Sequence, residues 1–74
     1  MKHLIYVVPT GSDDISAEIP LHVMAEDLLP IMGWKTEREC VYDYLLTPVQ
    51  IEGIEKLTKQ AFPKSAALYL ACDD

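Results

Sequence analysis

The sequence predicts one small domain of the α/β or α+β class, with strands and helices in the order strand, helix, strand, helix, strand. Three observations support this prediction. Two short runs, at residues 3–8 and 66–72, are apolar at almost every position, which is typical of strands covered on both faces. Helical patterns at residues 20–29 and 47–62 separate these runs. A length of 74 residues allows only one domain, so we expect residues 1–74 to fold together around a three-stranded sheet.

The first strand is predicted at His3 to Val8. This run is rich in β-branched and aromatic side chains, and Pro9 and Gly11 close it with a turn signal. Because the run is apolar on both faces, we expect it to occupy the middle of the sheet.

The next segment permits two structures. Residues 15–20 alternate between apolar and polar side chains, which is typical of a strand, and Pro20 would restrict such a strand to a sheet edge. The apolar residues that follow recur with a helical period. We therefore predict a helix from about Pro20 to Leu29, ended early by Pro30, and leave open an extra edge strand near residues 15–20.

Residues 35–46 are also ambiguous. Thr36 and Glu39 have the spacing of a capping box, which favours a helix. Against this, apolar and aromatic side chains recur at every second position from Cys40 to Leu46, as in a strand. The balance favours a strand within residues 37–46, whose direction the sequence leaves open.

The second helix, Thr47 to Phe62, is the clearest element. Thr47 is the expected N-cap, Pro48 suits the first helical position, and Gln50 completes a capping box. Pro63 should end the helix. Two pairs of opposite charge have the favourable i, i+4 order, namely Glu52–Lys56 and Glu55–Lys59.

The last strand is predicted at Ala66 to Cys72. Helical crossovers between the strands favour parallel pairing, with the first strand in the middle. The alternative is a two-layer α+β arrangement with both helices on one face of the sheet and the other face exposed. Parallel pairing of the first and last strands would bring four aspartates together at one edge of the sheet, namely Asp13, Asp14, Asp73 and Asp74.

The charge balance limits the possible partners. The chain has 12 Asp and Glu against 6 Lys and Arg, a net charge of −6, and no basic cluster. Direct nucleic-acid binding is therefore not expected, since it requires clustered cations. No apolar run approaches the ~20 residues of a membrane helix, and the N-terminal apolar run is shorter than the about 7–15 residues of a secretory signal. We expect a cytoplasmic protein without a membrane association or a cofactor.

An excess of acidic residues between positions 13 and 27 indicates a surface for a basic partner. If the first helix began near Ser16, then Glu18, His22 and Glu26 would form one row on its surface. The candidate partner-binding residues are Asp13, Asp14, Glu18, His22, Glu26 and Asp27. The simpler interpretation is a solvated face, since charged rows on helices commonly lack a partner.

The four tyrosines provide a second candidate surface. All lie on predicted strands, and tyrosine is enriched in protein interfaces. The possible interface residues are Tyr6, Tyr42, Tyr44 and Tyr69. The alternative is that they cover the edge of the core with their hydroxyls in water.

The two cysteines give no catalytic or metal signature. Cys40 and Cys72 are 32 positions apart, form no C-x-x-C motif, and fall on apolar faces of predicted strands. We expect buried, unreactive thiols and no metal site built on them.

The leading hypothesis is a non-enzymatic acidic interaction protein. Such an adaptor or inhibitor would dock on a basic surface of a protein partner, including a partner that itself handles nucleic acid. The alternative is a homo-oligomeric structural subunit that associates through a tyrosine-bearing sheet face. A third hypothesis is a small metal-dependent enzyme or metal sensor using the aspartate cluster.

Overall fold

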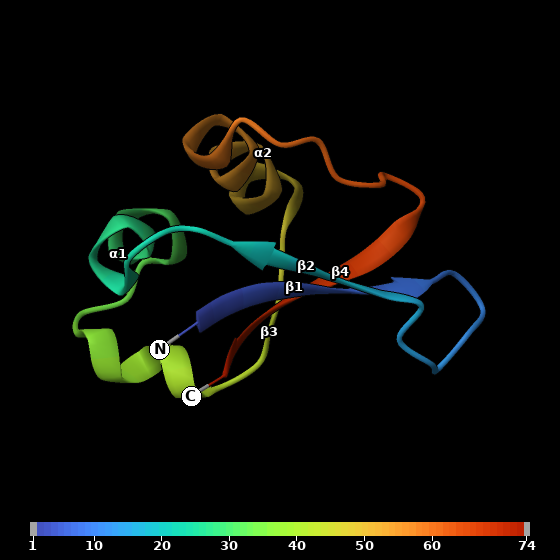
Figure 1. Cartoon of the computed structure of the whole chain (residues 1–74), viewed down its shortest axis with the longest axis horizontal. Helices are drawn as coiled ribbons and strands as arrows, with labels where there is room; N and C mark the ends of the chain where they lie inside the picture. The colour runs from blue at the N-terminus through green and yellow to red at the C-terminus, as the bar shows by residue number, and fades with distance from the viewer. Residues whose placement is uncertain (1, 74) are drawn as a thin grey trace.

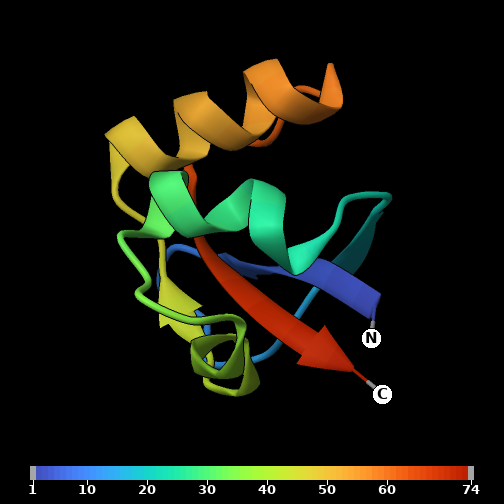
Figure 2. The same cartoon turned by 90° about the vertical axis from the view of Figure 1, so that its left-hand side faces the viewer.

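A computed structural model describes residues 2–73, apart from the side chains of residues 41 and 73. It shows a four-stranded antiparallel sheet in the order β2-β1-β4-β3, with both α-helices on one face (Figures 1 and 2). The elements in chain order are β1 (Lys2–Pro9), β2 (Ala17–Leu21), α1 (Ala25–Met32), the 3-10 helix η1 (Glu37–Val41), β3 (Tyr44–Leu45), α2 (Pro48–Thr58) and β4 (Ala66–Asp73).

Of the two predicted classes, α+β is confirmed, in the alternative arrangement with both helices on one face. The inner position of β1 is confirmed as well, and the extra edge strand left open near residues 15–20 is present as β2. The expectation of parallel pairing is wrong. A tight turn folds β1 directly back onto β2: Ser12 N–H donates to the carbonyl of Pro9 at 3.0 Å, and Gly11 has a φ of 83°. A hairpin requires antiparallel strands, which fixes the pairing of β1 with β2. Independently of this hairpin, β4 enters after α2 and also runs antiparallel to β1.

The strand interpretation holds for residues 17–21, and the predicted helix begins later than expected, at Ala25. Pro20 lies opposite Leu4 on an edge strand, where its missing N–H leaves no gap inside the sheet. The carboxylate of Asp27 accepts the N–H of Met24 at 3.0 Å and so satisfies one donor at the start of α1.

Pro30 does not end α1 early as predicted: the helix continues to Met32. In so short a helix, proline removes only one backbone hydrogen bond. Gly33 then takes the left-handed conformation, with a φ of 71°, and Trp34 N–H donates to the carbonyl of Leu29 at 3.1 Å.

The predicted strand over residues 37–46 is wrong except at β3. The Glu39 carboxylate accepts the N–H groups of Thr36, at 3.1 Å, and of Lys35, and these local bonds start η1. The capping-box pattern therefore outweighs the strand alternation here, since a local turn forms without any partner strand.

The start of α2 is as predicted. Gln50 N–H donates to Thr47 Oγ1 at 3.2 Å, and Thr47 N–H donates to Gln50 Oε1 at 2.9 Å. The helix ends at Thr58 rather than Phe62, because Lys59 takes the left-handed conformation.

The charge pairs of α2 are only partly as predicted. The Glu52–Lys56 pair forms at 3.3 Å. Glu55 does not pair with Lys59. Its carboxylate binds the Lys64 ammonium at 2.6 Å and accepts the Phe62 N–H at 2.8 Å. These two contacts lower the pKa of Glu55, and they fix the loop after α2.

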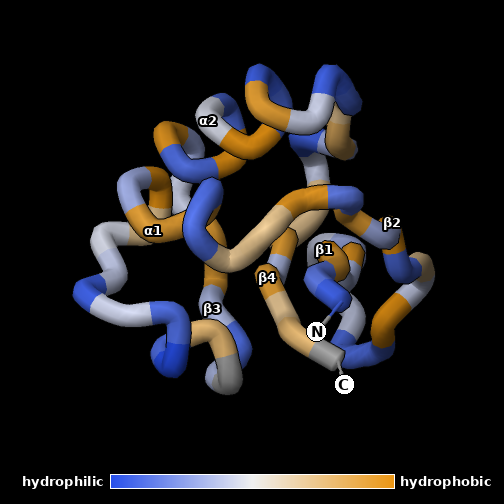
Figure 3. Tube along the Cα trace, turned by 60° about the vertical axis from the view of Figure 1, so that its left-hand side comes forward, coloured by the Kyte–Doolittle hydropathy of each residue, from blue (hydrophilic) through white to orange (hydrophobic). Residues whose placement is uncertain are grey.

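The core lies between the sheet and the two helices. Hydrophobic and hydrophilic residues alternate along α1 and α2 (Figure 3). Leu28 of α1 and Ile54 of α2 are fully buried in the core, as expected for amphipathic helices. The most deeply buried side chains are Ile5, Leu28, Cys40, Ile54, Leu68 and Leu70. None of the helices within residues 2–73 is long and apolar enough to cross a membrane.

Candidate functional site

The strongest candidate site is the face of the sheet that α1 and α2 leave uncovered, which we call the open face. Residues directly opposite one another in a sheet point to the same side. The strand register therefore places one row of side chains across all four strands: Glu18, Tyr6, Tyr69 and Leu45. The neighbouring row, Ile19, Ile5, Leu70 and Tyr44, points towards the core.

The open face contains a hollow of about 310 Å³. Its floor comes from adjacent strands, and the β1–β2 loop and the residue before β3 form its walls. The lining residues are Tyr6, Val8, Ser12, Asp13, Ile15, Asp43 and Tyr69.

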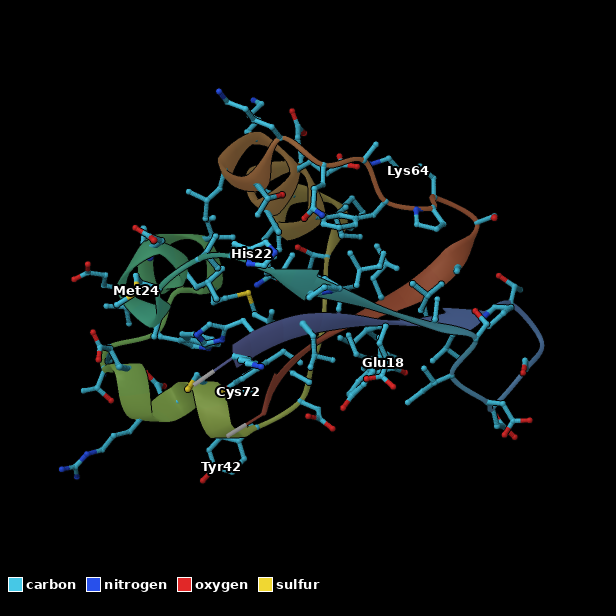
Figure 4. All side chains as sticks on the ribbon, viewed as in Figure 1. Glu18, His22, Met24, Tyr42, Lys64 and Cys72 are labelled. Carbon is cyan, nitrogen blue, oxygen red and sulfur yellow. The ribbon has the colours of Figure 1, made fainter. Side chains whose placement is uncertain are left out.

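The rim of the hollow is acidic. Asp13 and Asp43 line it, and Glu18 lies opposite Tyr6. Glu18 points away from the helices, whereas Lys64 lies on the helix side (Figure 4). The ion pairs found among residues 2–73 are Lys56–Glu52 and Lys64–Glu55, so these lysines do not neutralise the rim.

Exposed apolar side chains lie in and beside the hollow. Ile15, which lines it, is 50% exposed, and Leu45, next to Tyr69 in the open-face row, is 60% exposed. Tyr42 is also exposed, on the same side of the molecule as Glu18 (Figure 4). The open face thus combines aromatic and aliphatic contact area with uncompensated negative charge, a composition suited to binding a cationic ligand.

The structure separates the six predicted partner-binding residues into two groups. Asp13, Asp14 and Glu18 lie in the β1–β2 loop and on β2, at or near the open face. The other three, His22, Glu26 and Asp27, lie before or within α1.

The proposed row of Glu18, His22 and Glu26 does not exist. Glu18 belongs to a strand, where side chains alternate every two residues and do not follow a helical face. Asp27 serves in part to hold the start of α1.

The predicted cluster of terminal aspartates is also wrong. Because β1 and β4 are antiparallel, Asp73 lies opposite Lys2, at the other end of β1 from Asp13 and Asp14. An eight-residue strand separates these ends by roughly 25 Å. Asp74 is outside the described residues. Among the side chains that the structure describes, which exclude those of residues 73 and 74, no three His, Cys, Asp or Glu are grouped so that they could hold a metal ion.

The tyrosines divide between the two sides of the sheet. Tyr6 and Tyr69 lie directly opposite each other on the open face. Tyr44 faces the core, 5.3 Å from the Trp34 ring, and its hydroxyl donates to the Glu39 carbonyl at 2.6 Å. Burial and the nearby Glu39 carboxylate raise the pKa of Tyr44, so it remains a neutral donor. Tyr42 follows η1 and is not in a strand.

Asp43, Val8 and Ile15 were not among the residues that the sequence suggested for a site. The parity of β1 places Val8 on the same side as Tyr6, which sequence periodicity could have shown. Asp43 reaches the hollow only because the chain from η1 enters β3 beside β4, and no local pattern contains that information.

Comparisons with known proteins identify no relative. No protein-family model matches the chain, no curated protein is significantly similar to it in sequence, and no solved structure is significantly similar to it in fold. Any functional proposal therefore depends on the site itself.

Proposed function

We propose that this protein is a non-catalytic binding domain that docks through its open face on a basic surface of a protein partner. The observation behind the proposal is the hollow over Tyr6 and Tyr69, whose charged lining residues, Asp13 and Asp43, are both acidic. Bound in this way, the domain would act as an adaptor or would inhibit the partner by covering its basic surface, including one that otherwise binds nucleic acid.

The chemistry of the hollow suits arginine and lysine side chains. A guanidinium or ammonium group can stack on the tyrosine rings while the carboxylates of Asp13, Asp43 and Glu18 accept its N–H groups. The net charge of −6 would speed the encounter with a basic partner, and salt would weaken that attraction.

The charge of the open face also makes a basic partner more favourable than a second copy of the chain. Two open faces brought together would oppose like-charged rims, which is unfavourable. The sheet edges are likewise poorly suited to pairing between copies, because β2 contains Pro20 and β3 has only two residues. We therefore favour a basic partner over the homo-oligomer hypothesis, and sedimentation at high concentration would test the latter directly.

The docking proposal can be tested with defined basic peptides. The isotope-labelled chain would be titrated with short arginine-rich peptides, with lysine-rich and glutamate-rich peptides of equal length as comparisons, and followed by amide NMR shifts. We expect shifts that map to Tyr6, Val8, Ile15 and Tyr69 with the cationic peptides alone, and an affinity that falls as salt rises.

Two variants with equal charge separate the open face from the rest of the surface. The face variant combines Asp13→Asn, Glu18→Gln and Asp43→Asn. The matched variant changes three exposed acids elsewhere, through Glu26→Gln, Glu37→Gln and Glu52→Gln. Both change the net charge from −6 to −3, so the long-range attraction of the peptide falls equally in the two variants.

We expect the face variant to lose about tenfold or more in peptide affinity and the matched variant to lose much less, since only the former removes direct contacts. Equal losses in the two variants would mean that only the overall charge attracts the peptide. A larger loss in the matched variant would place the site away from the open face, near α1, η1 or α2. Binding that salt does not weaken would contradict the electrostatic proposal.

A further inference from the structure

The fold brings together the two cysteines of the chain. Cys40 lies in η1 and Cys72 lies near the end of β4, 32 positions later, yet their Sγ atoms are 3.5 Å apart. Both are reduced thiols. Cys40 is 2% exposed and Cys72 is half-buried, beside η1 (Figure 4).

We propose that Cys40 and Cys72 form a reversible intramolecular disulfide when the protein meets a hydroperoxide. In the first step, the Cys72 sulfur attacks the peroxide O–O bond, which gives Cys72 sulfenic acid and one water when hydrogen peroxide is the oxidant. In the second, the Cys40 sulfur attacks the sulfenic sulfur, which forms the S–S bond and releases a second water. The two thiols together lose two electrons and two hydrogens, and the peroxide is reduced.

The order of the two steps follows from exposure. Solvent reaches the half-buried Cys72, whereas Cys40 is enclosed in the core. Oxidation is selective for accessible thiols, so Cys72 is the residue that meets the oxidant and Cys40 the one that resolves it.

The remaining movement is small. Sulfur atoms in a disulfide are about 2.05 Å apart, so the two Sγ atoms must approach by about 1.5 Å. The segment that must shift is the short 3-10 helix η1. It is held by hydrogen bonds to Glu39, whose carboxylate accepts the Thr36 N–H and whose carbonyl accepts the Tyr44 hydroxyl. A turn of this kind can adjust without disturbing the ladder between β1 and β4.

The disulfide would fasten η1 to the end of β4. A crosslink across 32 residues restricts the unfolded chain strongly, so it should stabilise the fold. This inference stands on the thiol geometry and does not depend on the proposed docking function.

The test begins with the fully reduced protein. After treatment with hydrogen peroxide, remaining thiols are alkylated and the protein is digested for mass spectrometry. We expect a crosslink between the segments containing Cys40 and Cys72 within one chain, reversed by dithiothreitol. The midpoint of thermal unfolding of the oxidised protein should rise by about 10 °C.

Two serine variants assign the roles of the cysteines. Cys72→Ser lies at a half-buried position and should fold, and its Cys40 thiol should resist peroxide because the core encloses it. Cys40→Ser should leave Cys72 as a sulfenic acid that a dimedone probe captures. Circular dichroism of both variants checks that they are folded. If Cys40→Ser is unfolded, the crosslink in the wild-type protein still tests the proposal.

Several results would overturn the proposal. One is independent overoxidation of the cysteines with no crosslink, and another is crosslinking only between chains. A third is an intramolecular crosslink that forms more slowly in the folded protein than in urea, because the fold would then not be what brings the thiols together.

Discussion

The two faces of the sheet are built from the same strands but differ in burial and in charge. On the face covered by helices, Ile5 and Leu70 lie opposite each other and are almost fully buried. On the open face, the adjacent pair Tyr6 and Tyr69 remains partly exposed above an acidic hollow. The difference shows that alternate residues of one strand can form the core on one side and leave an acidic, partly aromatic surface on the other.

The covered face should account for the largest losses of stability. Ile5→Ala removes a fully buried side chain from the centre of the sheet, and we expect it to lower the free energy of unfolding by about 2–5 kcal/mol. Small domains are commonly stable by only about 5 kcal/mol, so part of the variant should be unfolded in buffer. Urea titration followed by circular dichroism measures the loss.

Tyr69→Thr is the matched change on the open face. Threonine also favours strands, so we expect a loss of only about 1 kcal/mol, from contacts with the opposite residues such as Tyr6. The free energy of peptide binding to the hollow should fall by far more than the free energy of unfolding. If Tyr69→Thr destabilised the fold as strongly as Ile5→Ala, the open face would be a structural surface as well.

An intermediate effect should come from His3, the polar side chain on the covered face. It is buried, its Nδ1 has no hydrogen-bond partner, and burial lowers its pKa. The unfolded chain therefore takes up a proton more readily than the folded one. Stability should be full above the ordinary histidine pKa of 6.5 and should decline as the pH falls below it.

Urea titrations of the wild type and of His3→Leu between about pH 7 and about pH 5 test this prediction. We expect stability to fall across this window in the wild type and to change much less in the variant. The comparison concerns the slope, so it holds even if leucine changes the stability at neutral pH. Equal slopes in the two proteins would show that His3 does not titrate differently on folding.

The smallest effect is expected at an exposed ion pair far from both faces. The side chains of Lys56 and Glu52 are 77% and 66% exposed. Lys56→Ala should therefore change the free energy of unfolding by no more than about 0.5 kcal/mol. Thermal unfolding should show this small difference at low salt and a still smaller one at high salt, where the pair is screened; a loss comparable to that of Ile5→Ala would contradict the prediction.

Local patterns were sufficient for some elements. The inner strand around Ile5 and the capped start of α2 at Thr47 follow from side chains within a few residues of one another. For the edge strand containing Pro20, local patterns left a strand and a helix both open. Where two local signals competed, as over residues 37–46, the alternation was the misleading one, because a strand needs a neighbour and a capped turn does not.

The sequence by itself determined the alternation of apolar and polar residues, the caps and the negative charge, since each depends on neighbours in the chain. Only the tertiary structure decided the antiparallel order of the strands, the position of Asp43 in the same hollow as Tyr69, and the meeting of Cys40 and Cys72. These depend on how segments distant in the chain pack together. That packing follows from the burial of the whole core and not from any local pattern.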